Sequence, residues 1–278
     1  MKQTVLIPTD FSENALRAAI YALDLAAQLK LDVYVLHAYQ PFKSAFQSAS
    51  TNENDADRAR KEAETGMEEF IKKLGDRREL KTRVVNKSLV DAIGDCAAKQ
   101  QVGLVVMGTH GKSPVRRDLL GSNTYEVAKS TAIPLLVVPE QVGSFALKQV
   151  VFFSDYQAGD VQTLRSLETV FGDLPFSVNL VHILPGKYTS MEAEQSRLDE
   201  WKTTLEKQVP SGGLVANLVE GEESVSVVEE TLARFRADIA LLTIVNRSFF
   251  QNLFTKSLAR AIVLNPQVPI LLTSEAMK

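Results

Sequence analysis

The segment of residues 107–123, MGTHGKSPVRRDLLGSN, carries residue types and a spacing that suit phosphate binding. Gly108 and Gly111 follow the apolar run LVVM, and without side chains they let the backbone turn sharply and approach a ligand closely. Gly121 and Ser122 stand where a helix is expected to begin, and the amide groups at a helix N-terminus attract anions. Each feature alone is common loop chemistry, but the combined spacing, Gly-x2-Gly-x9-Gly-Ser, favours a phosphate site.

Charged and polar side chains in and around this segment could complete such a site. Asp10 follows the first apolar run of the chain and could hydrogen-bond a sugar or a base, cap the next helix, or do both. Lys112, Arg116 and Arg117 could attract phosphate or lie on a solvated loop surface. His110 lies inside the glycine turn, where it could contact a ligand phosphate.

No catalytic constellation accompanies the candidate site in the sequence. The chain has no P-loop and no recognisable base, nucleophile or metal-ligand set, so no catalytic residue is assigned. Its single cysteine, Cys96, excludes an intrachain disulfide and a thiolate zinc site, and is expected to be a small buried residue on a helix. The sequence therefore points to binding and not to an identifiable reaction.

The elements that must position these residues alternate between short apolar runs and segments of helical period. In the first half, the runs TVLIPT, DVYVLHA, TRVVN, GLVVMGT and PLLVVP are nearly continuous in apolar character, as buried parallel strands are. One helix is expected after a cap at Asp10 or Ser12, and another at GSNTYEVAKS, where Asn123 and Glu126 have capping-box spacing. The alternation predicts an α/β fold with a doubly wound sheet, whose ligands bind at the carboxyl ends of the strands.

The whole pattern occurs twice along the 278 residues. VLIPTDFSENA matches VVFFSDYQAGD, which places Asp10 opposite Asp155. We therefore expect two tandem domains, residues 1–141 and 147–278, joined near EQVGSFALKQ.

Three ring-bearing side chains are expected to be structural. His37 and His182 occupy matching positions at the ends of strands, where packing and a backbone hydrogen bond are favoured over a ligand role. Trp201 recurs with two leucines at helical spacing, which favours packing over ligand stacking.

The second copy lacks the glycine features of the first. Aligning Pro269 with Pro134 sets Thr243, Asn246, Lys256 and Ser257 opposite Gly108, Gly111, Gly121 and Ser122, respectively. Side chains at the first two positions would intrude where a backbone must approach a ligand, so this copy is not expected to bind phosphate in the manner of the first. Lys256 could still attract a different anion to this copy.

The pattern VLIPTDFSENA, then HAY, then MGTHGKSPVRRDLLGSNTYEVAKSTAIPLLVVP, resembles the universal stress protein family. The resemblance covers nearly the whole chain, but the glycine motif occurs only in the first half, so the chain looks like a tandem member. It implies two tandem doubly wound sheets of five parallel strands, each in the order 3-2-1-4-5, a fold similar to that of the adenine nucleotide alpha hydrolases. In ATP-binding members of the family, the nucleotide lies over the ends of strands one and four.

Carried over to this chain, the resemblance implies an ATP site in the first half only. The residues implied are Pro8, Thr9 and Asp10 at the nucleoside, Ala38 at the adenine edge, Met107 and Gly108 at the ribose, and Gly111, Gly121, Ser122 and Asn123 at the phosphates. Magnesium would come with the phosphates. The family often has a further glycine where this chain has Pro114, which leaves the position of Lys112 open.

Composition and edge strands set the remaining expectations. Interspersed charge with a net value of -3 argues against a nucleic-acid partner, and the absence of a run of about 18 apolar residues or a signal peptide favours the cytoplasm over a membrane. The apolar runs PLLVVP and PILLTS must be covered. The resemblance to the family implies strand-to-strand pairing of domains, which here predicts an intrachain pseudo-dimer and leaves a homodimer open. A scaffold without a ligand and a slow ATPase are the alternatives to an ATP-binding stress protein.

Overall fold

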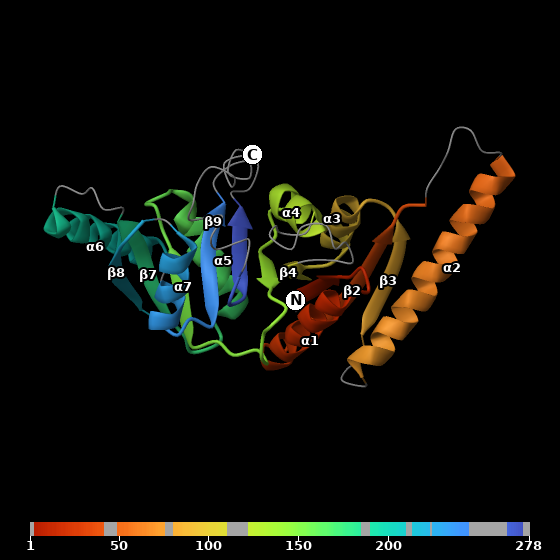
Figure 1. The fold of residues 1–278 in the computed structure, drawn as a ribbon, viewed down its shortest axis with the longest axis horizontal. Coiled ribbons are helices and arrows are strands. Elements are labelled where there is room, and N and C mark those ends of the chain that lie inside the picture. The colour runs from red at the N-terminus through yellow and green to blue at the C-terminus, as the bar shows by residue number, and fades with distance from the viewer. Residues whose placement is uncertain are drawn as a thin grey trace.

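The computed structural model describes residues 3–41, 49–75, 80–109, 122–184, 190–209, 213–222, 224–244 and 266–274. Figure 1 shows two halves side by side along the long axis of the molecule, each built around a sheet with helices against it. Several residues singled out in the sequence lie outside the described residues, namely His110, Gly111, Lys112, Pro114, Arg116, Arg117, Gly121, Asn246, Lys256 and Ser257.

The five strands predicted for the first half are present, and five more follow in the second half. They are β1 (Thr4–Pro8), β2 (Asp32–Tyr39), β3 (Lys81–Asn86), β4 (Val102–Gly108), β5 (Leu135–Val138), β6 (Gln149–Phe153), β7 (Ser177–Leu184), β8 (Leu214–Glu220), β9 (Ile239–Ile244) and β10 (Ile270–Ser274). Their order in space is β3-β2-β1-β4-β5-β10-β9-β6-β7-β8. Counted from its own first strand, each half has the order 3-2-1-4-5, so the predicted fold is confirmed.

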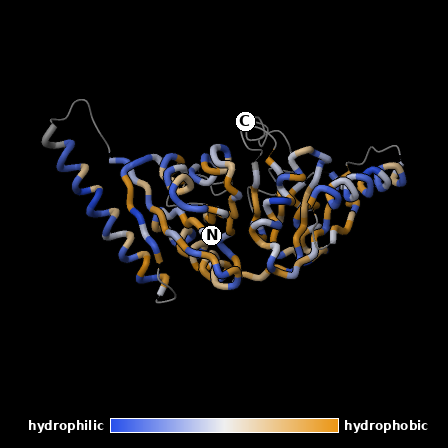
Figure 2. Tube along the Cα trace, turned by 180° about the vertical axis from the view of Figure 1, so that it is seen from behind, coloured by the Kyte–Doolittle hydropathy of each residue, from blue (hydrophilic) through white to orange (hydrophobic). Residues whose placement is uncertain are grey.

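Helices cover both faces of the sheet, as a doubly wound fold requires. The described helices are α1 (Glu13–Gln28), α2 (Ala49–Leu74), α3 (Leu89–Lys99), α4 (Ser122–Ser130), α5 (Gly159–Phe171), α6 (Met191–Gln208) and α7 (Val225–Arg234). Helices α1, α2, α5 and α6 pack on one face, and α3, α4 and α7 pack on the other. Figure 2 shows the hydrophobic residues concentrated along the strands between these layers. Within the described ranges, no helix has the length and apolar character needed to cross a bilayer.

Local sequence signals account for where several of the helices begin. Ser12 caps α1 by accepting a hydrogen bond from the Ala15 amide at 3.1 Å, and Ser88 caps α3 in the same way. Helix α4 begins at Ser122, so Asn123 is its second residue and not the predicted cap. Cys96 is buried in α3 at 2% exposure, as expected for a small apolar residue.

The two halves share one continuous sheet. The apolar edge strands β5 and β10 pair antiparallel, with Leu271 opposite Leu136 at the centre of the pairing. This pairing satisfies the backbone groups of both edges and buries their side chains, which is the physical reason for covering an apolar edge. The predicted pairing of the domains within one chain is thus present, and it merges the two expected sheets into a single ten-stranded sheet.

The connection between the halves packs against the sheet's α1 and α5 layer. Phe145 is 3% exposed, and its ring makes an edge contact with Tyr21 of α1 and a stacked contact with Phe171 of α5, at centroid distances of 5.5 and 6.2 Å. The Gln28 side chain donates to the carbonyl oxygen of Phe145 at 3.0 Å. The connection therefore fixes the two halves to each other.

Candidate functional site

The carboxyl ends of β1 and β4 lie side by side, because these parallel strands pair directly, with Leu6 opposite Val105. In a doubly wound sheet, the crevice at this switch in strand order is where ligands bind. Pro8 ends β1 and Gly108 ends β4, so both groups of predicted site residues reach the same edge of the sheet. Among the predicted residues, Pro8, Thr9 and Met107 are buried, Asp10, Ala38 and Gly108 are half-buried, and Ser122 and Asn123 are exposed.

Helix α4 begins beside the end of β4. The Thr124 hydroxyl donates to the carbonyl oxygen of Gly108 at 2.9 Å, which holds the first turn of α4 against the strand end. Ser122 and Asn123 are exposed, and the first turn contains no acidic side chain. Because the amides of a first turn carry the positive end of the helix dipole, this turn is suited to an anion.

A buried polar pair, which the sequence analysis missed, ties α1 to the same strand end. The Asn14 side-chain amide donates to the Thr109 hydroxyl at 3.1 Å, and both residues are buried. A Cβ atom at Gly108 would lie 3.0 Å from side-chain atoms of Asn14 and 3.1 Å from its carbonyl oxygen. The close approach of α1 therefore favours glycine at this position, independently of any ligand.

The turn after β1 is held by local hydrogen bonds and a ring stack. The Asp10 carboxylate accepts from the Ser12 amide at 3.0 Å. Phe11 has a left-handed φ of 62°, which is uncommon for a residue other than glycine, and its ring stacks on His37 with the centroids 4.2 Å apart. Because a carbonyl oxygen only accepts, Nδ1 of His37 carries a proton and donates to Thr9 at 2.7 Å. The structural role expected for His37 is confirmed.

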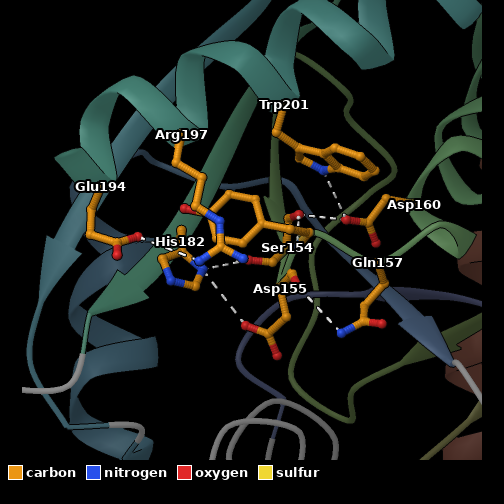
Figure 3. A network of polar contacts seen from close by, with 9 residues as sticks. Ser154, Asp155, Gln157, Asp160, His182, Glu194, Arg197 and Trp201 are labelled. Carbon is orange, nitrogen blue, oxygen red and sulfur yellow. Dashed lines mark hydrogen bonds and ion pairs between the residues drawn. The ribbon is translucent and has the colours of Figure 1, made fainter. Parts of the chain in front are cut away.

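The second half repeats this turn and adds charge to it (Figure 3). Tyr156 has a φ of 57°, and its ring lies 4.5 Å from that of His182, whose Nδ1 donates to the Ser154 carbonyl oxygen at 2.8 Å. His182 is thus structural as well. The Asp155 carboxylate lies 3.7 Å from the same nitrogen, and the Arg197 guanidinium covers the Tyr156 ring at 4.4 Å.

A buried carboxylate, Asp160, lies at the corresponding strand end in the second half. It is 1% exposed and accepts hydrogen bonds from Ser154 at 2.5 Å, from Thr243 at 2.7 Å and from the indole nitrogen of Trp201 at 3.2 Å (Figure 3 shows Ser154 and Trp201). The Thr243 hydroxyl also lies 2.9 Å from that of Thr163. Trp201 packs against the core as expected, with this hydrogen bond in addition.

The hydrogen bond between Thr243 and Asp160 lies at the end of β9, which corresponds to the end of β4 in the first half. Thr243 of β9 aligns with Gly108 of β4, and Asp160 of α5 aligns with Ala15 of α1. Burial raises the pKa of the Asp160 carboxyl, and the hydrogen bonds from its partners offset part of that rise. Asp160 was not predicted from the sequence, although an acidic residue among the apolar positions of a helix was the signal available.

Comparison with known proteins decides the family. The model of the universal stress protein family matches residues 1–139. The chain belongs to the universal stress protein family. A universal stress protein of Methanocaldococcus jannaschii is 30% identical over 138 residues, covering 48% of this chain and 80% of that protein. One of Thermus aquaticus is 30% identical over 138 residues, covering 50% and 99% of the two chains.

The fold match extends to the second half of this universal stress protein. The crystal structure of a universal stress protein from Archaeoglobus fulgidus covers 98% of this chain and 96% of its own, with a TM-score of 0.70 at 15% identity. At that identity the likeness shows the fold alone. Within the described residues, no group of three or more His, Cys, Asp and Glu side chains is placed to hold a metal ion.

Proposed function

We propose that the first half of this universal stress protein binds ATP across the ends of β1 and β4 and serves a stress-response or signalling role. The proposed contacts are Pro8, Thr9, Asp10, Ala38, Met107, Gly108, Gly111, Gly121, Ser122 and Asn123. The chain divides in this proposal into a binding domain, residues 1–141, and a structural domain, residues 147–278, both in the cytoplasm.

The hydrogen bond from Thr124 to the Gly108 carbonyl is the observation that carries the proposal. It holds the exposed first turn of α4 at the switch in strand order, where the backbone amides of the turn can donate hydrogen bonds to phosphate oxygens. The Asp10 carboxylate on the β1 side would repel phosphate and suits the uncharged sugar and base. The nucleotide would therefore lie with its nucleoside towards β1 and β2 and its phosphates towards α4.

Magnesium would accompany the phosphates of the nucleotide. Mg²⁺ in nucleotide sites is bound mainly through phosphate oxygens and water, with one or two protein carboxylates. The proposal therefore assigns no protein cage to the ion, and Asp10 is the carboxylate at the strand ends of the proposed site.

The second half is proposed to be structural because its own side chains occupy the corresponding crevice. Thr243 and Asp160 are hydrogen-bonded to each other at the position where the first half has Gly108 and Ala15. A ligand there would have to displace buried hydrogen bonds, whose loss costs about 1–3 kcal/mol for each group left unsatisfied.

The proposed site is tested by ATP-dependent stabilisation of two matched variants. Ser122→Glu places a carboxylate in the first turn of α4, and Ser226→Glu makes the same change in the first turn of α7, also at an exposed position. ATP with magnesium at about 100 times its dissociation constant should raise the free energy of unfolding of the wild type by about 2.7 kcal/mol. Ser122→Glu should lose most of this gain through charge repulsion, and Ser226→Glu should keep it.

The outcomes of this test separate the proposal from its alternatives. Equal ATP stabilisation in both variants would remove the site from the start of α4. No stabilisation of the wild type, together with no nucleotide released when the purified protein is denatured, would favour a scaffold. The ratio of ATP to ADP released from a loaded sample would show whether the site hydrolyses ATP.

A further inference from the structure

The two ends of the ten-stranded sheet are protected differently. Each outer strand has a helix packed against it, α2 at β3 and α6 at β8 (Figure 1). The difference is in charge, because β3, at one end, carries Lys81 and Arg83, and Lys81 pairs with Asp32 at 3.6 Å. Charged side chains on an edge strand hinder the addition of another strand. At the other end, β8 has the sequence LVANLVE, with Glu220 as its single charge, no proline, and an uninterrupted register against β7.

The free edge of β8 presents a regular row of backbone groups. The Gly213 carbonyl accepts from the Val178 amide at 3.5 Å, and the Gly221 amide donates to the Leu184 carbonyl at 3.0 Å, so odd-numbered residues face β7. Backbone direction alternates along a strand. The residues that direct their N–H and C=O groups outward are therefore Leu214, Ala216, Leu218 and Glu220. No hydrogen bond from the described residues outside the sheet reaches these groups.

We propose that β8 pairs with β8 of a second copy of this chain, antiparallel about a two-fold axis, to form one sheet across both molecules. A two-fold axis makes the paired strands antiparallel and the contact self-complementary. A register centred on Asn217 uses all the outward-facing residues, because Leu214 then lies opposite Glu220 of the second copy and Ala216 opposite Leu218. The two Glu220 carboxylates fall at opposite ends of the ladder and do not repel each other.

A second copy fits this edge because the chain already joins apolar edges in the same manner. The β5 and β10 strands, LLVV and ILLTS, pair antiparallel within the molecule without a charged residue in either. The Val215 side chain, 52% exposed on β8, would gain a neighbouring strand. The same contact at β3 would bring Arg83 next to Arg83 of the other copy, where like charges repel.

The first test is the mass of the full chain in solution together with exchange of single amides. Light scattering should give twice the mass of one chain, falling towards one chain on dilution. In the concentrated sample the amides of Ala216 and Leu218 should exchange roughly ten-fold more slowly than after dilution. The amides of Val215 and Asn217, which face β7, should be protected in both samples.

A matched pair of variants separates the two edges. Ala216→Lys places two ammonium groups near each other across the proposed axis and should give a monomer. Thr82→Lys adds the same charge to β3 and should leave the dimer intact.

Three results would overturn the proposal. These are a single-chain mass for the wild type at every concentration, unprotected Ala216 and Leu218 amides in the concentrated sample, or equal dissociation by both variants. The exchange measurement uses the wild type, so it decides the question even where Ala216→Lys does not fold. The outcome is independent of whether the first half binds ATP.

Discussion

At the scale of single residues, Asp160 is the clearest difference between the halves. A buried carboxylate is costly to ionise, and here it is tolerated because Ser154, Thr243 and Trp201 all donate to it. At the aligned positions the first half has two small residues, whereas the second half has these hydrogen-bonded side chains. Polar groups of the chain itself therefore satisfy one another at this place in the second half.

Asp160→Asn should change how the stability of the second half depends on pH. Burial raises the folded-state pKa of Asp160 above the ordinary value of 3.8, so the folded state holds the proton more tightly than the unfolded chain. Its stabilising contribution is complete below 3.8 and is lost as pH rises through the folded-state pKa, by about 1.4 kcal/mol for each pKa unit of the rise. The wild type should thus gain stability relative to Asp160→Asn as pH is lowered from neutral towards 4.

The measurement is thermal unfolding followed by the fluorescence of Trp201, the single tryptophan of the chain. A gap between wild type and Asp160→Asn that stays constant with pH would contradict this account of the network.

At the scale of secondary-structure elements, a glycine inside a helix shows whether the helix surface at that position is closely packed. A Cβ atom at Gly66 of α2 would lie 2.7 Å from the ring of Phe11, the residue with left-handed φ after β1. A Cβ atom at Gly94 of α3 would meet nothing within 4 Å. Gly66 thus admits the Phe11 ring, whereas Gly94 has no such packing reason in the described part of the chain.

Gly66→Ala and Gly94→Ala should shift stability in opposite directions. Alanine is favoured over glycine in a helix interior by about 1 kcal/mol, so Gly94→Ala should raise the free energy of unfolding by about that amount. Gly66→Ala should lower it, because the Phe11 ring is held by its stack on His37 and by Phe70. Urea unfolding of both variants measures the difference, and stabilisation by Gly66→Ala would show that the ring moves away freely.

At the scale of the whole molecule, the halves are joined in two ways. The β5 and β10 strands share backbone hydrogen bonds, and Phe145 of the connection packs between α1 and α5. Separation of the halves would expose an apolar strand edge on each side together with this buried ring. The molecule is therefore expected to unfold as one cooperative unit and not as two independent domains.

ATP binding should consequently stabilise the half that is proposed not to bind it. Trp201 lies in the second half, so its fluorescence reports unfolding there, while far-ultraviolet circular dichroism reports both halves. The two probes should give the same midpoint, and ATP should raise both midpoints together in the wild type but not in Ser122→Glu. Two separate transitions, with only one of them moved by ATP, would show that the halves are uncoupled.

The sequence by itself determined the features that depend on neighbouring residues. Alternating apolar runs and amphipathic segments predicted the strands, because a buried parallel strand and a half-buried helix each leave a local pattern. The match of Asp10 with Asp155 revealed the repeat, and the glycine spacing indicated which half could approach a phosphate. The apolar character of β5 and β10 was sufficient to predict that the two edges would be covered.

Only the tertiary structure decided the contacts between residues far apart in the chain. Asn14 meets Thr109, and Asp160 meets Thr243, across 95 and 83 residues of sequence. Neither pair forms a motif, because its geometry depends on where a helix crosses the end of a distant strand. The same holds for Gly108, whose missing side chain makes room for Asn14, and for the buried hydrogen bonds of Asp160.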